Sequence, residues 1–554
     1  MDNSTKQKLW KTADQLRSNM DAAEYKHVVL GLIFLKYISD SFSALRNKMQ
    51  EDDYYKNNPQ YIDEDMRDYC TEHNAFWVPN EARWEFLRDN APQPNIGKLI
   101  DDAMLSIEKE NPKLKNILNK NYARLSLPQG RLADLINTIS TIGFENGQTA
   151  PDALGEVYEY FLGMFADAEG KRGGQFYTAA SVVKTMVAIM APTENHKVYD
   201  PCCGSGGMFV QAARYMHRHN ATNQDMMSFR CYGVEKEPDT VKLAKMNLLL
   251  NNVRGEITEA NSFYSDPYNA FGRFDYVMAN PPFNVDEVVF DKVCDDARFN
   301  TYGVPRNKTK SAKKASDKKE TVPNANYLWI GYFATALNEN GKAALVMANS
   351  ASDAGGSELE IRKKMIQDGI ISQMVTLPSN MFSTVTLPAT LWFFNKQCTQ
   401  KDEILFIDAR NIFTQVDRAH RKFSDEQIKN LGVITRLYEG DSDAFWTLVN
   451  EYKSSGKQEE ADWLLERWPD GKYRDVIGLC KVAKITGEDG IEDNDWSLNA
   501  GRYVGVVIED DGMTSKEFRA EMLSLNGEFS KLSAEAADLQ KEIEKNMMDL
   551  FGEE

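Results

Sequence analysis

The segment Val198–Gly207, which reads VYDPCCGSGG, decides the fold of this chain. A short β-branched and aromatic run ends at Asp200, small residues follow, and a helix-forming segment, Gly207–His217, begins at once. The small residues Gly204, Ser205 and Gly206 let a ligand approach the backbone where the N–H groups of a helix start point outward. This strand, turn and helix predict a ligand site, with a purely structural glycine turn as the alternative.

The chain on either side of this segment alternates short strand-like runs with helical patterns. The predicted strands are Val198–Asp200, Phe229–Glu235, Phe274–Asn280, Ala343–Ala348, Ile371–Leu377 and Thr390–Phe394. Such alternation is typical of an α/β fold with a doubly wound, mostly parallel sheet. The first two strands and the helix between them form a βαβ unit of suitable length.

Helical patterns flank this sheet on both sides and suggest three domains. We expect an N-terminal helical domain at 1–150, an α/β domain at 151–412 and a C-terminal helical region at 413–554. The last helix carries apolar residues at alternating spacings of four and three, which favours a partner helix over packing on its own domain. These residues are Phe518, Met522, Leu525, Phe529, Leu532, Ala536, Leu539 and Ile543.

The composition of the 554 residues is that of a globular protein, with 42% hydrophobic and 27% charged residues. We expect no membrane span, and a cytoplasmic location fits the N-terminus, which lacks the apolar core of a secretory signal. The seven cysteines show no metal-ligand spacing, so no metal site is expected, and Cys202 and Cys203 are expected to pack as small residues.

Asp200 and Glu235 indicate the chemistry of the ligand. A dinucleotide-binding fingerprint would need G-x-G-x-x-G around a pyrophosphate, whereas an acidic residue at the strand end repels phosphate and suits a cationic or amine-bearing ligand. S-adenosylmethionine has a sulfonium, an amino acid moiety and a nucleoside without phosphate. Glu235, at the end of the second strand, can accept hydrogen bonds from both ribose hydroxyls. The pair therefore predicts an S-adenosylmethionine site.

A second motif, Asn280-Pro281-Pro282-Phe283, follows a later strand and falls at the same carboxyl edge of the sheet. The Asn280 side-chain carbonyl and the Pro281 backbone carbonyl can accept the two protons of an aromatic amine, which favours a pyramidal nitrogen aimed at the methyl group. Phe283 offers a flat face for stacking, and a base inside a duplex would have to be flipped out to reach it. A plain proline-rich turn is the alternative.

In this order, Asp200–Gly207, Glu235 and Asn280–Phe283 resemble the motifs of amino-directed DNA methyltransferases. The resemblance implies a Rossmann-like, S-adenosylmethionine-dependent domain with Asn280, Pro281, Pro282 and Phe283 as catalytic residues. It also implies that one segment covers the methionine end of the cofactor, formed by Gln175, Phe176, Tyr177, Thr178, Ala179 and Ala180. Asn261 is expected to contact the cofactor as well. Carbon-directed cytosine methyltransferases would place a cysteine where Asn280 stands.

Over nearly its whole length the chain resembles the modification subunits of type I restriction-modification enzymes. The resemblance is carried by Leu9-Trp10, Leu30–Asp40, Gly174–Thr178, Trp496–Leu498 and Arg502–Val504. It implies transfer of a methyl group to the 6-amino group of adenine in DNA. It also implies a separate specificity subunit that joins two copies of this chain, and a restriction and translocation subunit on another polypeptide, because no Walker-A spacing occurs here.

The net charge of the chain suggests that a partner contributes to DNA binding. A net charge of −18 opposes strong DNA binding by this chain alone, since phosphate neutralisation supplies most non-specific affinity. The strongly basic stretch Arg306–Lys319 could contact phosphate or be a solvated loop, and it looks longer than the corresponding connection in the family. The sequence does not decide between these two roles.

Other functions remain open at this stage. The same motif serves methyltransferases of protein glutamine, although those enzymes are small and lack long helical flanks. The 4-amino group of cytosine offers similar chemistry, and Asn rather than Ser before Pro-Pro favours adenine. The remaining alternative is an inactive scaffold that binds the cofactor without methyl transfer. The sequence argues against it, because it retains all four expected site residues, Asp200, Glu235, Asn280 and Phe283.

Overall fold

The computed structural model describes residues 3–14, 22–73, 75–125, 130–141, 150–169, 178–193, 196–218, 229–306, 320–382, 388–418, 420–507 and 514–551. These residues form two compact units, Met1–Val504 and Gly505–Glu554. The first unit holds the sheet and both predicted motifs. The second holds one long helix, and each unit is described by itself.

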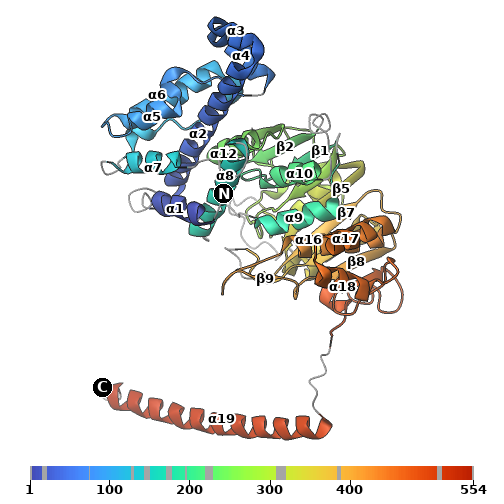
Figure 1. Ribbon diagram of the computed structural model, residues 1–554. Coiled ribbons are helices and arrows are strands. Elements are labelled where there is room, and N and C mark those ends of the chain that lie inside the picture. The colour runs from blue at the N-terminus through green and yellow to red at the C-terminus, as the bar shows by residue number, and fades with distance from the viewer. Residues whose placement is uncertain are drawn as a thin grey trace. The chain divides into compact units, whose positions relative to one another are not determined.

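A nine-stranded sheet forms the centre of the α/β part of the first unit (Figure 1). Its order is β11-β8-β6-β7-β5-β4-β1-β2-β3, and all neighbouring pairs are parallel except β5–β7, β6–β7 and β8–β11. All strands but β7 and β11 therefore end at one edge. The strands are β1 (Lys197–Asp200), β2 (Arg230–Glu235), β3 (Gly255–Glu259), β4 (Phe274–Ala279), β5 (Leu337–Ala348), β6 (Ile371–Thr376), β7 (Ala389–Asn395), β8 (Glu403–Asp408) and β11 (Cys480–Lys484).

The predicted α/β fold with a mostly parallel sheet is confirmed, and all six predicted strands are present within a few residues of their expected bounds. β5 begins at Leu337, six residues before its predicted start at Ala343, and its pairing with β4 shifts register there. β3, β8 and β11 were not predicted. In β3 a single residue, Ile257, is buried, so this edge strand lacks the apolar alternation that marks the others.

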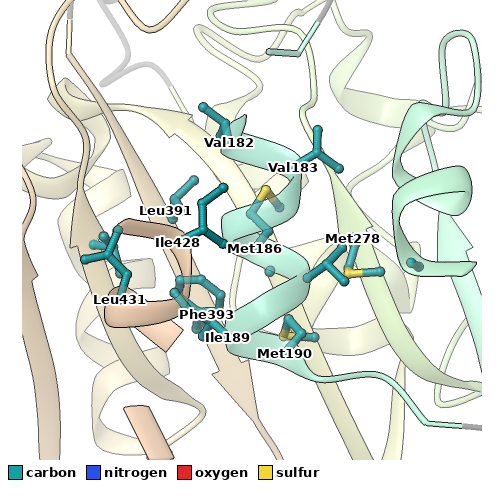
Figure 2. Close-up of a cluster of buried hydrophobic side chains, with 14 of the residues drawn as sticks. Val182, Val183, Met186, Ile189, Met190, Met278, Leu391, Phe393, Ile428 and Leu431 are labelled. Atoms are coloured by element: carbon teal, nitrogen blue, oxygen red, sulfur yellow. The ribbon is translucent and has the colours of Figure 1, made fainter. Parts of the chain in front are cut away.

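Helices cover both faces of the sheet, as a doubly wound fold requires. One face packs against α9 (Ala180–Met190), α10 (Gly207–Arg218), α12 (Pro238–Leu250), α16 (Asp425–Tyr438), α17 (Ser442–Ser454) and α18 (Gln458–Arg467). The other packs against α13 (Ala297–Asn300), α14 (Asn326–Ala336) and α15 (Ser357–Gln367). Figure 2 shows the first face, where α9 meets β4, β7 and α16 through Val182, Val183, Met186, Ile189, Met190, Met278, Leu391, Phe393, Ile428 and Leu431.

The residues after 412 form the expected helices and also contribute strands. They contribute β11, which pairs antiparallel with β8 along five residues, and α16, which packs against α9. A short hairpin, β9 (Thr414–Gln415) and β10 (Arg421–Lys422), comes first. The expected helices beyond 412 are therefore present, and the region also adds a strand to the sheet, whose short sequence, CKVAK, carries little apolar signal.

The N-terminal part is helical, as predicted, and is built around the 30-residue α2 (Ala22–Glu51). By length and hydropathy the portion Tyr25–Glu51 could cross a membrane, but 72% of its apolar window is buried among the described helices, as expected of a core helix. Around it lie α1 (Asn3–Asp14), α3 (Asp53–Asn57), α4 (Ile62–Glu72), α5 (Trp84–Asp89), α6 (Ile96–Glu110), α7 (Arg131–Ser140) and α8 (Ala150–Glu169).

The helix α12 joins the helical part to the sheet. Its residues Leu243 and Met246 belong to the apolar core of the N-terminal helices, whereas Val241, Ala244 and Leu248 belong to the core of the sheet. A helix that is apolar on both sides must be buried on both sides. The N-terminal helices thus pack directly on the helix that follows the end of β2.

In the second unit, α19 runs over Ser515–Phe551 and has no buried residue. Its apolar side chains are exposed, among them Phe529 at 70% and Ile543 at 62%. The predicted heptad residues of α19 are therefore exposed.

Candidate active site

The glycine turn after β1 is shaped by backbone geometry. Gly204 and Gly206 have φ angles of 51° and 77°, values that L side chains rarely adopt. The Gly206 N–H donates to the Cys203 carbonyl at 2.8 Å, and the Asn247 side-chain amide donates to the Ser205 carbonyl at 2.8 Å. Among the described residues, a Cβ added at Gly204 would meet no atom within 4 Å, so they leave the space over this turn open.

Asp200 and Glu235 lie at the same edge because β1 and β2 are adjacent and parallel, with Asp200 paired to Gly233. One Glu235 carboxylate oxygen accepts the Gly204 N–H at 3.0 Å and the other accepts the Glu237 N–H at 2.9 Å. A carboxylate has about four lone-pair sites, so Glu235 keeps capacity for further donors. The Asp200 carboxylate accepts the Cys202 N–H at 2.9 Å.

The two cysteines of the turn pack as small side chains. Cys203 is buried, and a Cβ added at Gly233 would lie 2.8 Å from its Sγ and 2.6 Å from the Ile257 Cδ1. A larger residue at 203 would therefore collide with β2. Burial raises the pKa of both thiols, which keeps them neutral and poorly nucleophilic.

Burial also controls the charge of the two acids. Desolvation raises the pKa of Asp200 to about 8; the nearby Glu235 adds to the shift and the hydrogen bond from Cys202 opposes it. Burial likewise raises the pKa of Glu235, against the backbone hydrogen bonds it accepts. A positively charged ligand beside Asp200 would favour its ionised form.

Asn261 lies in the loop after β3, next to the end of β2. The Ala260 N–H donates to the Glu235 backbone carbonyl at 2.9 Å, and the Asn261 side-chain oxygen accepts the Phe263 N–H at 3.0 Å. The Ser262 hydroxyl donates to the Pro201 carbonyl, which ties this loop to the glycine turn. Arg298 holds the same loop by donating to the Ser262 carbonyl at 3.0 Å.

Asn280 directly follows β4, and its two amide atoms have different surroundings. The Nδ2 donates to the Thr178 hydroxyl at 2.9 Å, so the amide plane is anchored. The Oδ1 is buried and has no hydrogen-bond partner among the described residues. A buried acceptor left unpaired costs about 1 to 3 kcal/mol, and such atoms often belong to functional sites. The arrangement presents one fixed, vacant acceptor.

Pro281, Pro282 and Phe283, the other residues of the predicted catalytic loop, follow Asn280 directly. Pro281 is buried, and Pro282 and Phe283 are half-buried. Phe283 packs against the apolar cores of both faces of the sheet, so the loop lies where the two layers meet.

The structure thus brings Asp200, Gly204, Ser205, Gly206, Glu235 and Asn261 together around one turn, and Thr178 to Asn280. Ala179 and Ala180 stand at the start of α9 beside Thr178. Gln175, Phe176 and Tyr177 lie outside the described residues, as does 307–319 of the basic stretch. Sequence reasoning missed Asn247, Ser262 and Arg298, which act through backbone carbonyls far along the chain and have no motif to mark them.

Two family models match the chain. The N-6 DNA Methylase model covers residues 149–511, and the HsdM N-terminal domain model covers residues 5–139. Together they span the first unit almost entirely.

Named relatives and solved structures agree with these models. The methylase subunit of the type I restriction enzyme MjaIX from Methanocaldococcus jannaschii is 35% identical, over 98% of this chain and 91% of its own length. That of HindI from Haemophilus influenzae is 34% identical, over 85% of this chain and 99% of its own. The crystal structure of a type I restriction-modification methyltransferase subunit from Streptococcus thermophilus has a TM-score of 0.67 at 24% identity and covers 90% of this chain and 99% of its own, which shows a shared fold.

Proposed function

This chain belongs to the N-6 DNA methylase family, among the methylase subunits of type I restriction enzymes, and we propose that Asn280–Phe283 is its catalytic loop. It is an adenine-specific DNA methyltransferase subunit of a type I restriction-modification system. The observation that carries the assignment of the loop is the buried, vacant Oδ1 of Asn280 beside its anchored Nδ2.

We propose that S-adenosylmethionine is the methyl donor and lies over the glycine turn; when bound, it supplies an electrophilic methyl group on a sulfonium. The residues present fit it. The open space at Gly204 admits a ligand to the backbone, and Glu235 retains lone pairs for ribose hydroxyls. The proposed cofactor residues are Gln175, Phe176, Tyr177, Thr178, Ala179, Ala180, Asp200, Gly204, Ser205, Gly206, Glu235 and Asn261.

Asn280 would act on the attacking amine through hydrogen bonds. An aromatic amine is a weak nucleophile because its lone pair is delocalised into the ring. When the Asn280 Oδ1 and the Pro281 carbonyl each accept one N–H of the adenine 6-amino group, the nitrogen becomes pyramidal and its lone pair localises. Because Thr178 anchors the Asn280 amide, the acceptor needs no reorganisation during the reaction.

Phe283 would hold the base in place by stacking on its ring. An adenine within a duplex cannot reach a buried Oδ1, so the target nucleotide must be extruded from the helix. Its unstacking is offset in part by contact with Phe283, whose side chain is supported by both layers of the fold.

Partners complete this function. We propose that α19, with its exposed heptad residues, binds a specificity subunit that chooses the DNA site, and that two copies of this chain join one such subunit. The net charge of −18 supports a division of labour in which the partner supplies much of the affinity for DNA. A restriction and translocation subunit would join the same assembly in the cytoplasm.

Methyl transfer from labelled S-adenosylmethionine to DNA, with and without the co-expressed specificity subunit, tests this proposal. Labelled N6-methyladenine formed only with the partner, and lost in Asn280→Ala, is the expected result. Labelled cytosine would reassign the base, labelled protein would reassign the substrate, and cofactor binding without any transfer would indicate a scaffold. Activity without the partner would place site recognition within this chain.

A further inference from the structure

Asn284, the residue directly after Phe283, has a left-handed backbone. Its φ angle is 54°, which non-glycine residues adopt at a cost because Cβ approaches the backbone, although asparagine tolerates it better than most. The side chain of Asn284 is exposed, so burial does not impose this conformation. Backbone strain of this kind persists where surrounding contacts hold it, often beside an active site.

Two asparagines from the start of α14 hold Asn284. The Asn284 N–H donates to the Asn326 Oδ1 at 2.8 Å, and the Asn326 Nδ2 donates back to the Asn284 Oδ1 at 3.0 Å. The Asn324 Nδ2 donates to the same Oδ1, also at 3.0 Å. Asn326 is only 4% exposed, so its two bonds to Asn284 are partly shielded from water, whereas the bond from Asn324 is exposed.

Hydrogen bonds of Tyr327 hold the start of α14 in place. The Tyr327 hydroxyl donates to the Ala351 carbonyl at 2.7 Å and accepts from the buried Arg362 guanidinium at 3.0 Å. Arg362 also donates to the Trp496 carbonyl at 2.7 Å. All eleven residues of α14 are buried, so Asn326 projects from a rigid support.

We infer that Asn326 is a positioning residue for methyl transfer: it holds Asn284 in its left-handed conformation and thereby sets the place of Phe283 and Pro282 in the catalytic loop. It acts through Asn284 and does not contact the base. The inference rests on the proposed role of Asn280–Phe283. It requires that loss of the clamp slows transfer without weakening the cofactor site, which lies on β1 and β2 rather than on α14.

A matched pair of substitutions at Asn284 tests the inference in the complex with the specificity subunit. Asn284→Ala and Asn284→Gly lose the same side-chain hydrogen bonds and differ only in a Cβ, hence in tolerance of a positive φ. We expect Asn326→Ala and Asn284→Ala to lower the single-turnover rate of adenine methylation by about 10- to 100-fold, the range that a small displacement of reacting groups produces. Asn284→Gly should stay near the parent rate and should restore most of the rate to Asn326→Ala.

Asn269, another asparagine with a left-handed φ, of 49°, is the matched control. Neither its alanine nor its glycine variant should change the rate. Affinity for S-adenosylmethionine, measured by calorimetry, should be unchanged in all variants. Equal rates for the alanine and glycine variants at 284, a parent-like rate in Asn326→Ala, or an equal loss of cofactor affinity would overturn the inference, whereas absence of methyladenine from the parent complex would overturn the proposed function.

Discussion

Replacement of Asp200 by asparagine should abolish the pH dependence that this buried acid imposes on stability. Burial raises the pKa of Asp200 from 3.8 to about 8. Between these values the folded protein holds a proton that the unfolded chain has released, so unfolding is favoured as pH rises. Each pH unit in this window should lower the free energy of unfolding by about 1.4 kcal/mol, which amounts to roughly 3 kcal/mol between pH 5 and pH 7.

The substitution Asp200→Asn keeps the shape of the side chain and an oxygen that can accept the Cys202 N–H. The variant therefore removes the titrating group and leaves the turn intact. Urea denaturation of both proteins at pH 5, 6 and 7 measures their free energies of unfolding. The value for the variant should rise relative to that of the parent by about 1.4 kcal/mol per pH unit. Parallel stability curves for the two proteins would refute the reasoning.

The same carboxyl should make cofactor binding depend on pH. Below a pKa of about 8 the free protein holds Asp200 mostly neutral, and a cationic ligand favours the ionised form. Affinity of the parent for S-adenosylmethionine should therefore rise with pH toward 8, with a proton released on binding, whereas Asp200→Asn should bind weakly at every pH. Calorimetry in two buffers of different ionisation enthalpy measures the proton count, and a count of zero would show that Asp200 does not face the charge.

Three further outcomes are expected. Asn280→Ala should lower the methylation rate by about 10²- to 10³-fold without loss of cofactor affinity. Its urea midpoint should stay close to that of the parent, because removal of the unpaired buried Oδ1 offsets loss of the Nδ2 hydrogen bond to Thr178; a parent-like rate would exclude Asn280 from the chemistry. Glu235→Gln should weaken cofactor binding by about tenfold in a calorimetric titration, since one acceptor oxygen replaces two that take the Gly204 and Glu237 N–H groups; unchanged affinity would place the ribose elsewhere. Truncation after Val504 should abolish co-purification with the specificity subunit and spare cofactor binding, because α19 belongs to a separate unit and has no buried residue; retained co-purification would assign the interface to another surface.

The sequence alone was sufficient for the parts of this protein that depend on local geometry. A strand that ends in Asp200, glycines with positive φ and a helix start are all encoded within one short segment, and the spacing to Glu235 follows from one βαβ unit. The proline-rich loop after β4 was found in the same way. These motifs carry their own conformational requirements, so no knowledge of distant residues was needed.

Only the tertiary structure decided which distant residues complete the site. Thr178 and Asn280 are 102 residues apart, and Asn326 is 42 residues from Asn284, yet each pair shares a hydrogen bond because sheet order brings their elements together. The polar residues involved carry no periodic signal. Their partners depend on burial and strand order, which are set by packing of the whole chain rather than by neighbouring residues.

Four other elements, α2, α12, β11 and α19, show the same difference between what the sequence predicts and what the tertiary structure decides. The apolar pattern of α2 predicts a buried helix. The sequence does not predict that α12 is buried both by the sheet and by the N-terminal helices, because its residues belong to two separate apolar cores. The sequence does not predict β11 either, because this strand is stabilised by pairing with β8. For α19 the heptad pattern predicts a partner helix, because its exposed apolar residues would be buried by association with one.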